Sequence, residues 1–111
     1  MRKVIRFIER NFDKPLSLQD AAMVASLSPK YLSRLFKEET HKSFTEFRIN
    51  LRLEKAKELL EKTRLTVKEI SDRTGYDTAE AFEKVFKKFE GLTPTEYRRR
   101  DKTSVNRIPT P

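Results

Sequence analysis

The amino-acid sequence predicts an all-α fold, and three observations support this prediction. Apolar residues recur three or four positions apart, as at Leu53, Ala56 and Leu60, which is the spacing of one helix face. Residues that cap helices come directly before such segments, as Ser28 does before Pro29. The chain has only two glycines, and a β-rich fold would need more of them for its turns.

Seven helices are expected over the 111 residues. Their approximate ranges are 2–12, 18–25, 29–39, 44–62, 67–74, 79–90 and 94–100. The end of the chain contains two prolines and almost no large apolar side chains, so we expect a flexible tail there. The expected organisation is a first subdomain over 1–44, a linker helix over 45–64, a second subdomain over 65–100 and the tail over 101–111.

The chain contains an internal repeat with a period of 49 to 50 residues. Residues 16–18 (Leu-Ser-Leu) recur as residues 65–67 (Leu-Thr-Val), 49 positions later, whereas Phe36 recurs as Phe86, 50 positions later. One residue has therefore been inserted in the second copy, and we place it near residues 78–81. Only two copies fit, which indicates a duplicated supersecondary unit rather than a solenoid.

Signals for helix starts repeat with the same period. Thr66–Glu69 has the pattern of a capping box, and Ser17–Asp20 is its near equivalent. Ser28 is expected to cap the helix that begins at Pro29, and Asp77 is its expected counterpart in the second copy. Each copy therefore predicts a capped short helix, a tight turn and a capped second helix.

This order of elements is that of a helix-turn-helix motif, whose second helix enters the major groove of DNA. Ala22 and Ser71 supply the small residue where the two helices touch, and Ser26 and Gly75 stand in the turns. The sequence therefore predicts two helix-turn-helix subdomains joined by a long linker helix, a homeodomain-like architecture.

The second helix of the first copy is expected to carry a basic outward face opposite an apolar inward face. The outward positions are Lys30, Ser33, Arg34 and Lys37. Arginine and lysine donate to guanine O6 and N7, and serine pairs with several base edges. A charged helix face is usually just solvated, but its place in a repeated helix-turn-helix favours DNA reading here.

The second helix of the second copy differs on its outward side. We interpret its aromatic positions as core, namely Phe82, Val85, Phe86 and Phe89. Its outward positions are Glu80, Glu83, Lys84 and Lys87. Glutamate accepts a hydrogen bond from cytosine N4, but a phosphate backbone repels it. We interpret Glu80 as a partner of the helix N-terminus, through its dipole or as a cap.

The charge of the chain favours a polyanionic partner, since the net charge is +8. This charge is uneven: the net charge is +4 over residues 1–44, +2 over 45–64, −2 over 65–97 and +4 over 98–111. The first subdomain, the linker helix and the end of the chain therefore carry the positive potential.

Other classes of protein fit less well. The chain has one histidine and no cysteine, and no nucleophile is paired with a base, so we expect no enzyme, no metal and no cofactor. RNA binding would need exposed aromatic side chains, and membrane-surface binding would need exposed large apolar residues on a helix; we expect neither. The absence of cysteine fits a reducing cytoplasm.

About residues 1–100 resemble the DNA-binding domain of AraC/XylS-type transcriptional regulators. The most specific stretches are 65–70, 75–76, 81–88, 91–94 and 97–98, together with 31–37 in the first copy. The resemblance implies that two recognition helices enter successive major grooves, about one helical turn apart. It places base contacts at Lys30, Ser33, Arg34, Ala79, Glu80, Glu83 and Lys84. We expect phosphate contacts from Lys37, Lys87, Arg98 and Arg99.

The resemblance implies double-stranded DNA as the partner in a bacterial cytoplasm, and it is compatible with RNA polymerase as a second partner. Family members usually carry a further domain for effector sensing, dimerisation or phosphorylation. None fits in this chain, so it is either an excised domain or a minimal regulator. His41 stands where the first copy of the family usually has glycine, and we expect it to be a left-handed turn residue. The acidic Glu80 and Glu83 predict an asymmetric DNA site, read mainly by the first copy.

Overall fold

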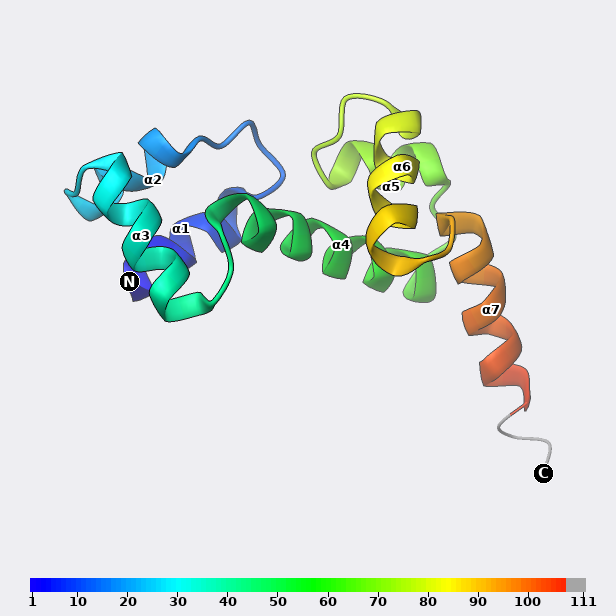
Figure 1. The fold of residues 1–111 in the computed structure, drawn as a ribbon. Helices are drawn as coiled ribbons and strands as arrows, with labels where there is room; N and C mark the ends of the chain where they lie inside the picture. The colour runs from blue at the N-terminus through cyan, green and yellow to red at the C-terminus, as the bar shows by residue number, and fades with distance from the viewer. Residues whose placement is uncertain (108–111) are drawn as a thin grey trace. The chain divides into compact units, whose positions relative to one another are not determined.

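The computed structural model describes the backbone of residues 1–107 and the side chains of residues 1–100. Over this part of the chain the regular structure is entirely helical, which confirms the all-α prediction (Figure 1). The helices are α1 (Arg2–Asn11), α2 (Leu18–Ala25), α3 (Pro29–Thr40), α4 (Phe44–Lys62), α5 (Val67–Arg73), α6 (Ala79–Glu90) and α7 (Pro94–Arg107). None of these described helices combines the length and the apolar character that a membrane span requires.

The chain divides into two compact units, one from Met1 to Arg52 and one that starts at Leu53. The division falls inside α4, the helix that we treated as a separate linker. The first half of α4 therefore belongs to the first unit and the second half to the second. Each unit is described by itself below.

In the first unit, α1 packs on α2 and α2 packs on α3. The core is built from apolar side chains that lie on the inward faces of these helices, chiefly Val4, Ile8, Ala21, Ala22, Leu32 and Phe36. The ring of Phe36 meets Phe44 and Phe47 edge to face, with centroid distances of 6.1 and 5.2 Å. This geometry is favoured for aromatic pairs, and it joins α3 to the start of α4.

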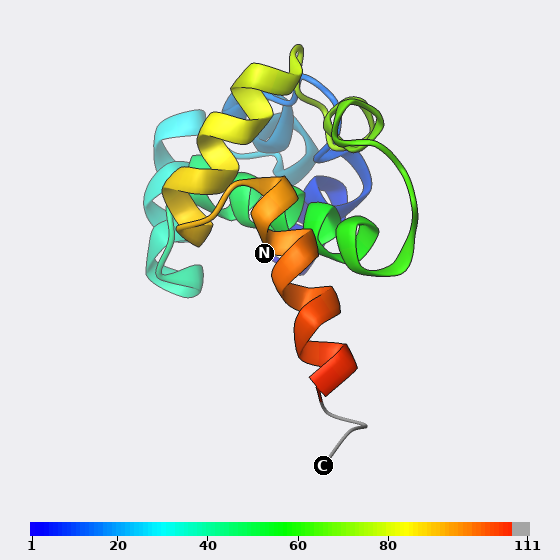
Figure 2. The same cartoon turned by 90° about the vertical axis from the view of Figure 1, so that its right-hand side faces the viewer.

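In the second unit, α5 packs on α6 and α6 packs on α7. Figure 2 views α5 nearly along its axis while α6 runs across the picture, so the two helices cross steeply, as in a helix-turn-helix motif. The rings of Phe82 and Phe86 are fully buried. They form a continuous aromatic row with Tyr76 and Tyr97, with successive centroids 5.5 to 5.7 Å apart.

The capping boxes predicted at the starts of α2 and α5 are present. The backbone N–H of Glu69 donates to Thr66 Oγ1 at 3.1 Å, and the N–H of Thr66 donates to Glu69 Oε1 at 2.9 Å. Ser17 and Asp20 make the same reciprocal pair at 3.1 and 3.0 Å. Ser28 also caps α3 as predicted, since its hydroxyl accepts from the N–H of Tyr31 at 3.2 Å.

The cap of α6 is Thr78, so the prediction of Asp77 was wrong. Thr78 Oγ1 accepts from the N–H of Ala81 at 3.0 Å. A cap directly precedes the first helical residue, and α6 begins at Ala79. The left-handed turn residue Gly75 lies 49 positions after Ser26, whereas Thr78 lies 50 positions after Ser28. The inserted residue therefore lies between Gly75 and Thr78, just before the range 78–81.

Phe89 was wrongly predicted to be a core residue, because its side chain is 44% exposed. It lies on the same side of α6 as Phe82, but in the last turn of the helix, beyond the part that the core covers. The ammonium group of Lys88 lies 5.8 Å from the centroid of its ring. Helical periodicity gives the direction of a side chain but not how far the core extends along the helix axis.

Helix α7 continues to Arg107, seven residues beyond its expected end at Arg100. The expected helix end at residue 100 was therefore wrong, since the backbone of 101–107 is helical; the flexibility expected of residues 101–111 stays a prediction. This segment contains neither glycine nor proline, and the first helix-breaking residue is Pro109. Proline disfavours helical backbone at the residue before it. The rest of the expected tail, residues 108–111, lies outside the described residues.

Candidate nucleic-acid interface

Helix α3 presents a polar, mostly basic face to solvent. All four side chains predicted on its outward side are exposed, namely Lys30, Ser33, Arg34 and Lys37. On the opposite side Leu32 and Phe36 are completely buried. The core therefore holds the helix while the basic face stays accessible.

An open hollow of about 650 Å³ runs along this face. Leu18, at the start of α2, and Pro29 give it apolar walls, and the remainder of its lining comes from α3: Lys30, Ser33, Arg34, Lys37 and Glu38. The hollow thus combines hydrogen-bond donors with apolar surface, which is the mixture that base edges and thymine methyl groups require.

Arg34 has an aromatic neighbour that our sequence analysis missed. Its Cζ atom lies 5.5 Å from the centroid of the Tyr31 ring, a cation–π contact. Tyr31 is 44% exposed. Spacing could have revealed this pair, because residues three apart are neighbours on a helix surface.

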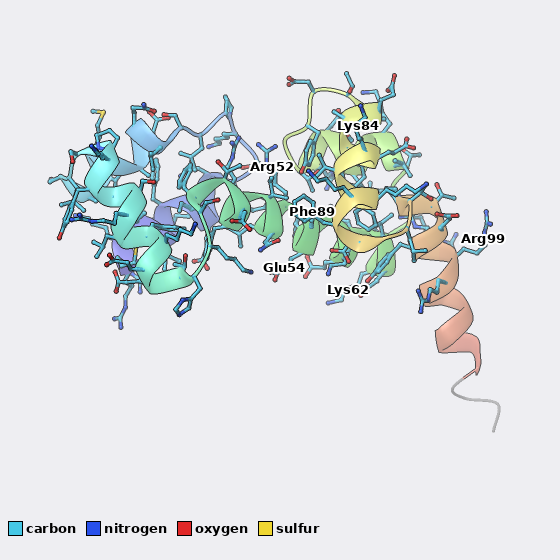
Figure 3. All side chains as sticks on the ribbon, in the orientation of Figure 1. Arg52, Glu54, Lys62, Lys84, Phe89 and Arg99 are labelled. Atoms are coloured by element: carbon cyan, nitrogen blue, oxygen red, sulfur yellow. The ribbon has the colours of Figure 1, made fainter. Side chains whose placement is uncertain are left out.

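Helix α6 repeats the burial pattern of α3 residue by residue, since residues 81–90 have the same sequence of buried and exposed positions as residues 31–40. Its outward side chains Glu80, Glu83, Lys84 and Lys87 are exposed, and Ala79 is half-buried. Figure 3 labels Lys84 on this helix. The two outward faces therefore have the same geometry and different charge.

The start of α6 is held by side-chain hydrogen bonds. The hydroxyl of Ser71, completely buried in α5, donates to the backbone oxygen of Thr78 at 3.0 Å. Glu80 lies in the first turn of α6, but Thr78 supplies the cap hydrogen bond. The capping role therefore belongs to Thr78, and an interaction of Glu80 with the helix dipole stays a prediction.

The predicted phosphate contacts on α7 differ in their surroundings. Nε of Arg98 donates to the backbone oxygen of Leu60 at 3.0 Å, and its Nη2 donates to that of Thr63 at 3.3 Å. Arg98 thus binds carbonyl groups at the end of α4. Arg99 is exposed on α7 (Figure 3).

Two arginines of the first unit make similar contacts that our sequence analysis also missed. Nη2 of Arg48 donates to the backbone oxygen of Lys14 at 2.9 Å, and Nε of Arg52 donates to that of Phe12 at 2.7 Å. Arg48 stands 50 residues before Arg98, so the repeat places these two arginines at equivalent positions. These side chains fix the loop after α1 against α4.

His41 is the left-handed turn residue that the sequence predicts, with φ 63° and ψ 17°. Its backbone N–H donates to the carbonyl oxygen of Lys37 at 2.9 Å and ends α3. Gly91 ends α6 in the same way, with φ 80°. Among the described residues, no group of three or more His, Cys, Asp or Glu side chains is placed to hold a metal ion.

Comparison with known proteins places this arrangement in a family. Residues 21–100 match the family model described as a helix-turn-helix domain. The C-terminal domain of AraT, a response regulator from Geobacillus stearothermophilus, is 41% identical with a TM-score of 0.86, and the match covers 89% of this chain and 83% of that one. A transcriptional regulator with an AraC-type DNA-binding domain from Chromobacterium violaceum is 27% identical with a TM-score of 0.83, covering 90% and 89%. The chain belongs to the AraC-type helix-turn-helix family.

This AraC-type domain also matches part of longer regulators. The uncharacterized transcriptional regulatory protein YesN of Bacillus subtilis is 40% identical over 102 residues, covering 88% of this chain and 28% of YesN. The domain thus spans less than a third of that relative. The DNA-binding domain of AdpA, solved in complex with a target DNA, shares the fold, with a TM-score of 0.87 over 93% of both chains at 22% identity.

Proposed function

We propose that α3 of this AraC-type DNA-binding domain enters the major groove of double-stranded DNA and reads its base sequence. One observation carries the proposal: Lys30, Ser33, Arg34 and Lys37 are all exposed on one face of α3. The opposite face of the helix is anchored in the core, so the reading side chains project from a rigid element. Rigid support is what base-specific hydrogen bonds need, because their geometry tolerates little displacement.

The roles follow from donor geometry. The planar guanidinium of Arg34 suits bidentate donation to guanine O6 and N7, and Lys30 can donate to the same atoms. Ser33 can donate or accept, so it fits several base edges. Lys37 lies one turn further along the helix and is assigned to a phosphate, where it adds affinity without selecting a sequence.

We assign α6 a weaker role in reading. Its base-facing candidates are Ala79, Glu80, Glu83 and Lys84, and two of these four repel a phosphate backbone. Lys87 and Arg99 are assigned to phosphates. Arg98 can contribute only the guanidinium donors that Leu60 and Thr63 do not use. The expected DNA site is therefore asymmetric, with most of its sequence information facing α3.

We further infer that the domain directs a transcriptional regulator to its promoters in a bacterial cytoplasm. The support is the family and the length of its relatives, since this chain makes up 13% of the regulator YtdP and 28% of YesN of Bacillus subtilis. Contact with RNA polymerase at such promoters is part of this proposal. Promoter occupancy in cells and a two-hybrid assay against polymerase subunits would test these two statements.

The test of the reading role is selection of binding sites from random duplex DNA, followed by measurement of affinity for single base-pair variants. Arg34→Ala is expected to relax specificity at one or two base pairs, by about 1–3 kcal/mol. Arg99→Ala is the control and should weaken all duplexes similarly. Equal losses on every sequence from both substitutions would contradict the assignment, as would tighter binding to single-stranded RNA than to any duplex.

The same affinity measurements test whether α6 reads fewer base pairs than α3. Glu83→Ala is expected to leave affinity unchanged or to raise it, because the substitution removes a negative charge near phosphates. Lys84→Ala, which removes a positive charge from the same face of α6, should lower affinity for DNA. A loss of selectivity at one cytosine in the Glu83→Ala protein would instead show that this carboxylate reads cytosine N4.

A further inference from the structure

We propose that Tyr31 is a positioning residue for Arg34, and that it thereby sets how sharply α3 discriminates between base pairs. The proposal rests on the function proposed above for α3 and adds a residue to it. Its starting point is the cation–π contact, in which the Cζ atom of Arg34 lies 5.5 Å from the centroid of the Tyr31 ring.

Tyr31 does little for the core, since 44% of its side chain is exposed while Leu32, its neighbour in sequence, is completely buried. Arg34 follows one helical turn later and is also exposed. The ring therefore lies on the helix surface beside a side chain assigned to base reading. Its contact with Arg34 is available before any DNA arrives.

Such a contact has a physical consequence for binding. An exposed arginine samples many rotamers, and restricting them on binding costs free energy. A ring beside the guanidinium restricts these rotamers in advance. A cation–π contact does not use up the N–H donors of the group, so they remain available to a guanine.

The second unit provides an internal comparison. The residues 50 positions after Tyr31 and Arg34 are Ala81 and Lys84. Both are exposed, as their counterparts are, but alanine supplies no ring for Lys84, and an ammonium group is not planar. The reading helix with the basic face is thus also the one whose central cation has a tyrosine ring beside it.

A competing partner for Arg34 lies on the same helix. Glu38 follows Arg34 by four residues and lines the same hollow, so a carboxylate rather than a ring could orient the guanidinium. Glu38→Gln removes that charge and keeps the size of the side chain. It is therefore the matched control for substitutions at Tyr31.

The experiment compares dissociation constants for the selected duplex and for the duplex altered at the base pair that Arg34→Ala relaxes. Tyr31→Leu, which removes the ring, is expected to lower the ratio of the two constants about two- to fivefold. Tyr31→Phe and Glu38→Gln should retain the ratio. In an Arg34→Ala background, Tyr31→Leu should change nothing further, because the two side chains act as a pair.

Three results would overturn the proposal: an unchanged ratio in Tyr31→Leu, equal weakening of every duplex, or the same loss when Arg34 is already alanine. Thermal unfolding checks each variant, and Tyr31→Gln, which also suits an exposed helix position, serves as a second ringless protein. If the unaltered chain bound no duplex selectively, the proposed function would fall. Loss of the Tyr31 effect with selectivity retained would overturn this inference alone.

Discussion

At the scale of single residues, the two units differ in which residue types occupy the positions with left-handed backbone conformation. Ser26 and His41 have positive φ in the first unit, where the second unit has Gly75 and Gly91. A residue with a Cβ atom loses about 1–2 kcal/mol in this conformation. The first unit therefore stores strain at two positions where glycine relieves it in the second.

His41→Gly is expected to stabilise the first unit by about 0.5–1 kcal/mol, since relief of the left-handed strain outweighs the greater backbone freedom of glycine when unfolded. Gly91→Ala is the reciprocal change and should destabilise by about 1 kcal/mol. A Cβ atom at Gly91 would meet nothing within 4 Å, so that cost is purely conformational. Urea unfolding measures both changes, and a neutral Gly91→Ala would contradict this account.

At the scale of helices, local hydrogen bonds decide where each element begins. Helix α5 has only seven residues, which is too short to be stable without a cap and tertiary packing. Its capping box also lowers the pKa of Glu69, chiefly through the hydrogen bond from the backbone N–H of Thr66. Backbone hydrogen bonds from Thr93 and Ser17 lower the pKa of Glu96 and Asp20 in the same way.

The lowered pKa of Glu69 makes this cap depend on pH. A carboxylate whose folded pKa lies below its unfolded value of about 4.3 stabilises the fold above that pH. The contribution is lost as the pH falls through the folded value. We expect Glu69→Gln to flatten part of the fall in stability below about pH 4.3, and the exposed Lys3→Gln, as control, to leave the fall nearly unchanged. Thermal unfolding between pH 7 and 3 measures this.

Arginine side chains connect neighbouring segments within both units. Arg98 donates to two carbonyl groups at the end of α4, and Arg48 and Arg52 donate to carbonyls after α1. Carbonyl groups at helix ends lack partners within the helix, and a guanidinium supplies several donors at once. These contacts tie α4 to the segment after α1 in the first unit, and α7 to the end of α4 in the second.

At the scale of the whole molecule, the chain is two compact units that share one helix. Phe36 and Phe86 are completely buried at equivalent places in the two copies. Removal of a buried phenylalanine ring costs about 3–5 kcal/mol. This is comparable with the total stability of a unit of about 55 residues, which is of order 3–8 kcal/mol.

Phe86→Ala is therefore expected to abolish hydrogen-exchange protection in α5 and α6 while α2 and α3 stay protected. Phe36→Ala should give the opposite pattern. Residue-resolved hydrogen exchange distinguishes the two cases. Loss of protection throughout the chain in either protein would mean that the units unfold as one.

Much of the fold could be predicted because its signals are local. The limits of α2, α4 and α6 agree with the sequence expectation, and the others differ at one end by one residue, apart from α7. Apolar spacing and capping residues act within one or two helical turns, so they can be read without tertiary contacts. Asp77 was wrongly predicted as a cap because the repeat offset changes from 49 to 50 in the turn before α6. Comparison of the two copies located this change only approximately.

The sequence by itself determined the helices, their inward faces, the left-handed turn at His41, the basic face of α3 and membership of the family. The tertiary structure alone decided that Phe89 is exposed and that Arg48, Arg52 and Arg98 bind backbone carbonyls. Those bonds join residues 34 to 40 positions apart. The physical reason is range: caps and periodicity depend on neighbours along the chain, whereas these contacts exist only once the helices have packed.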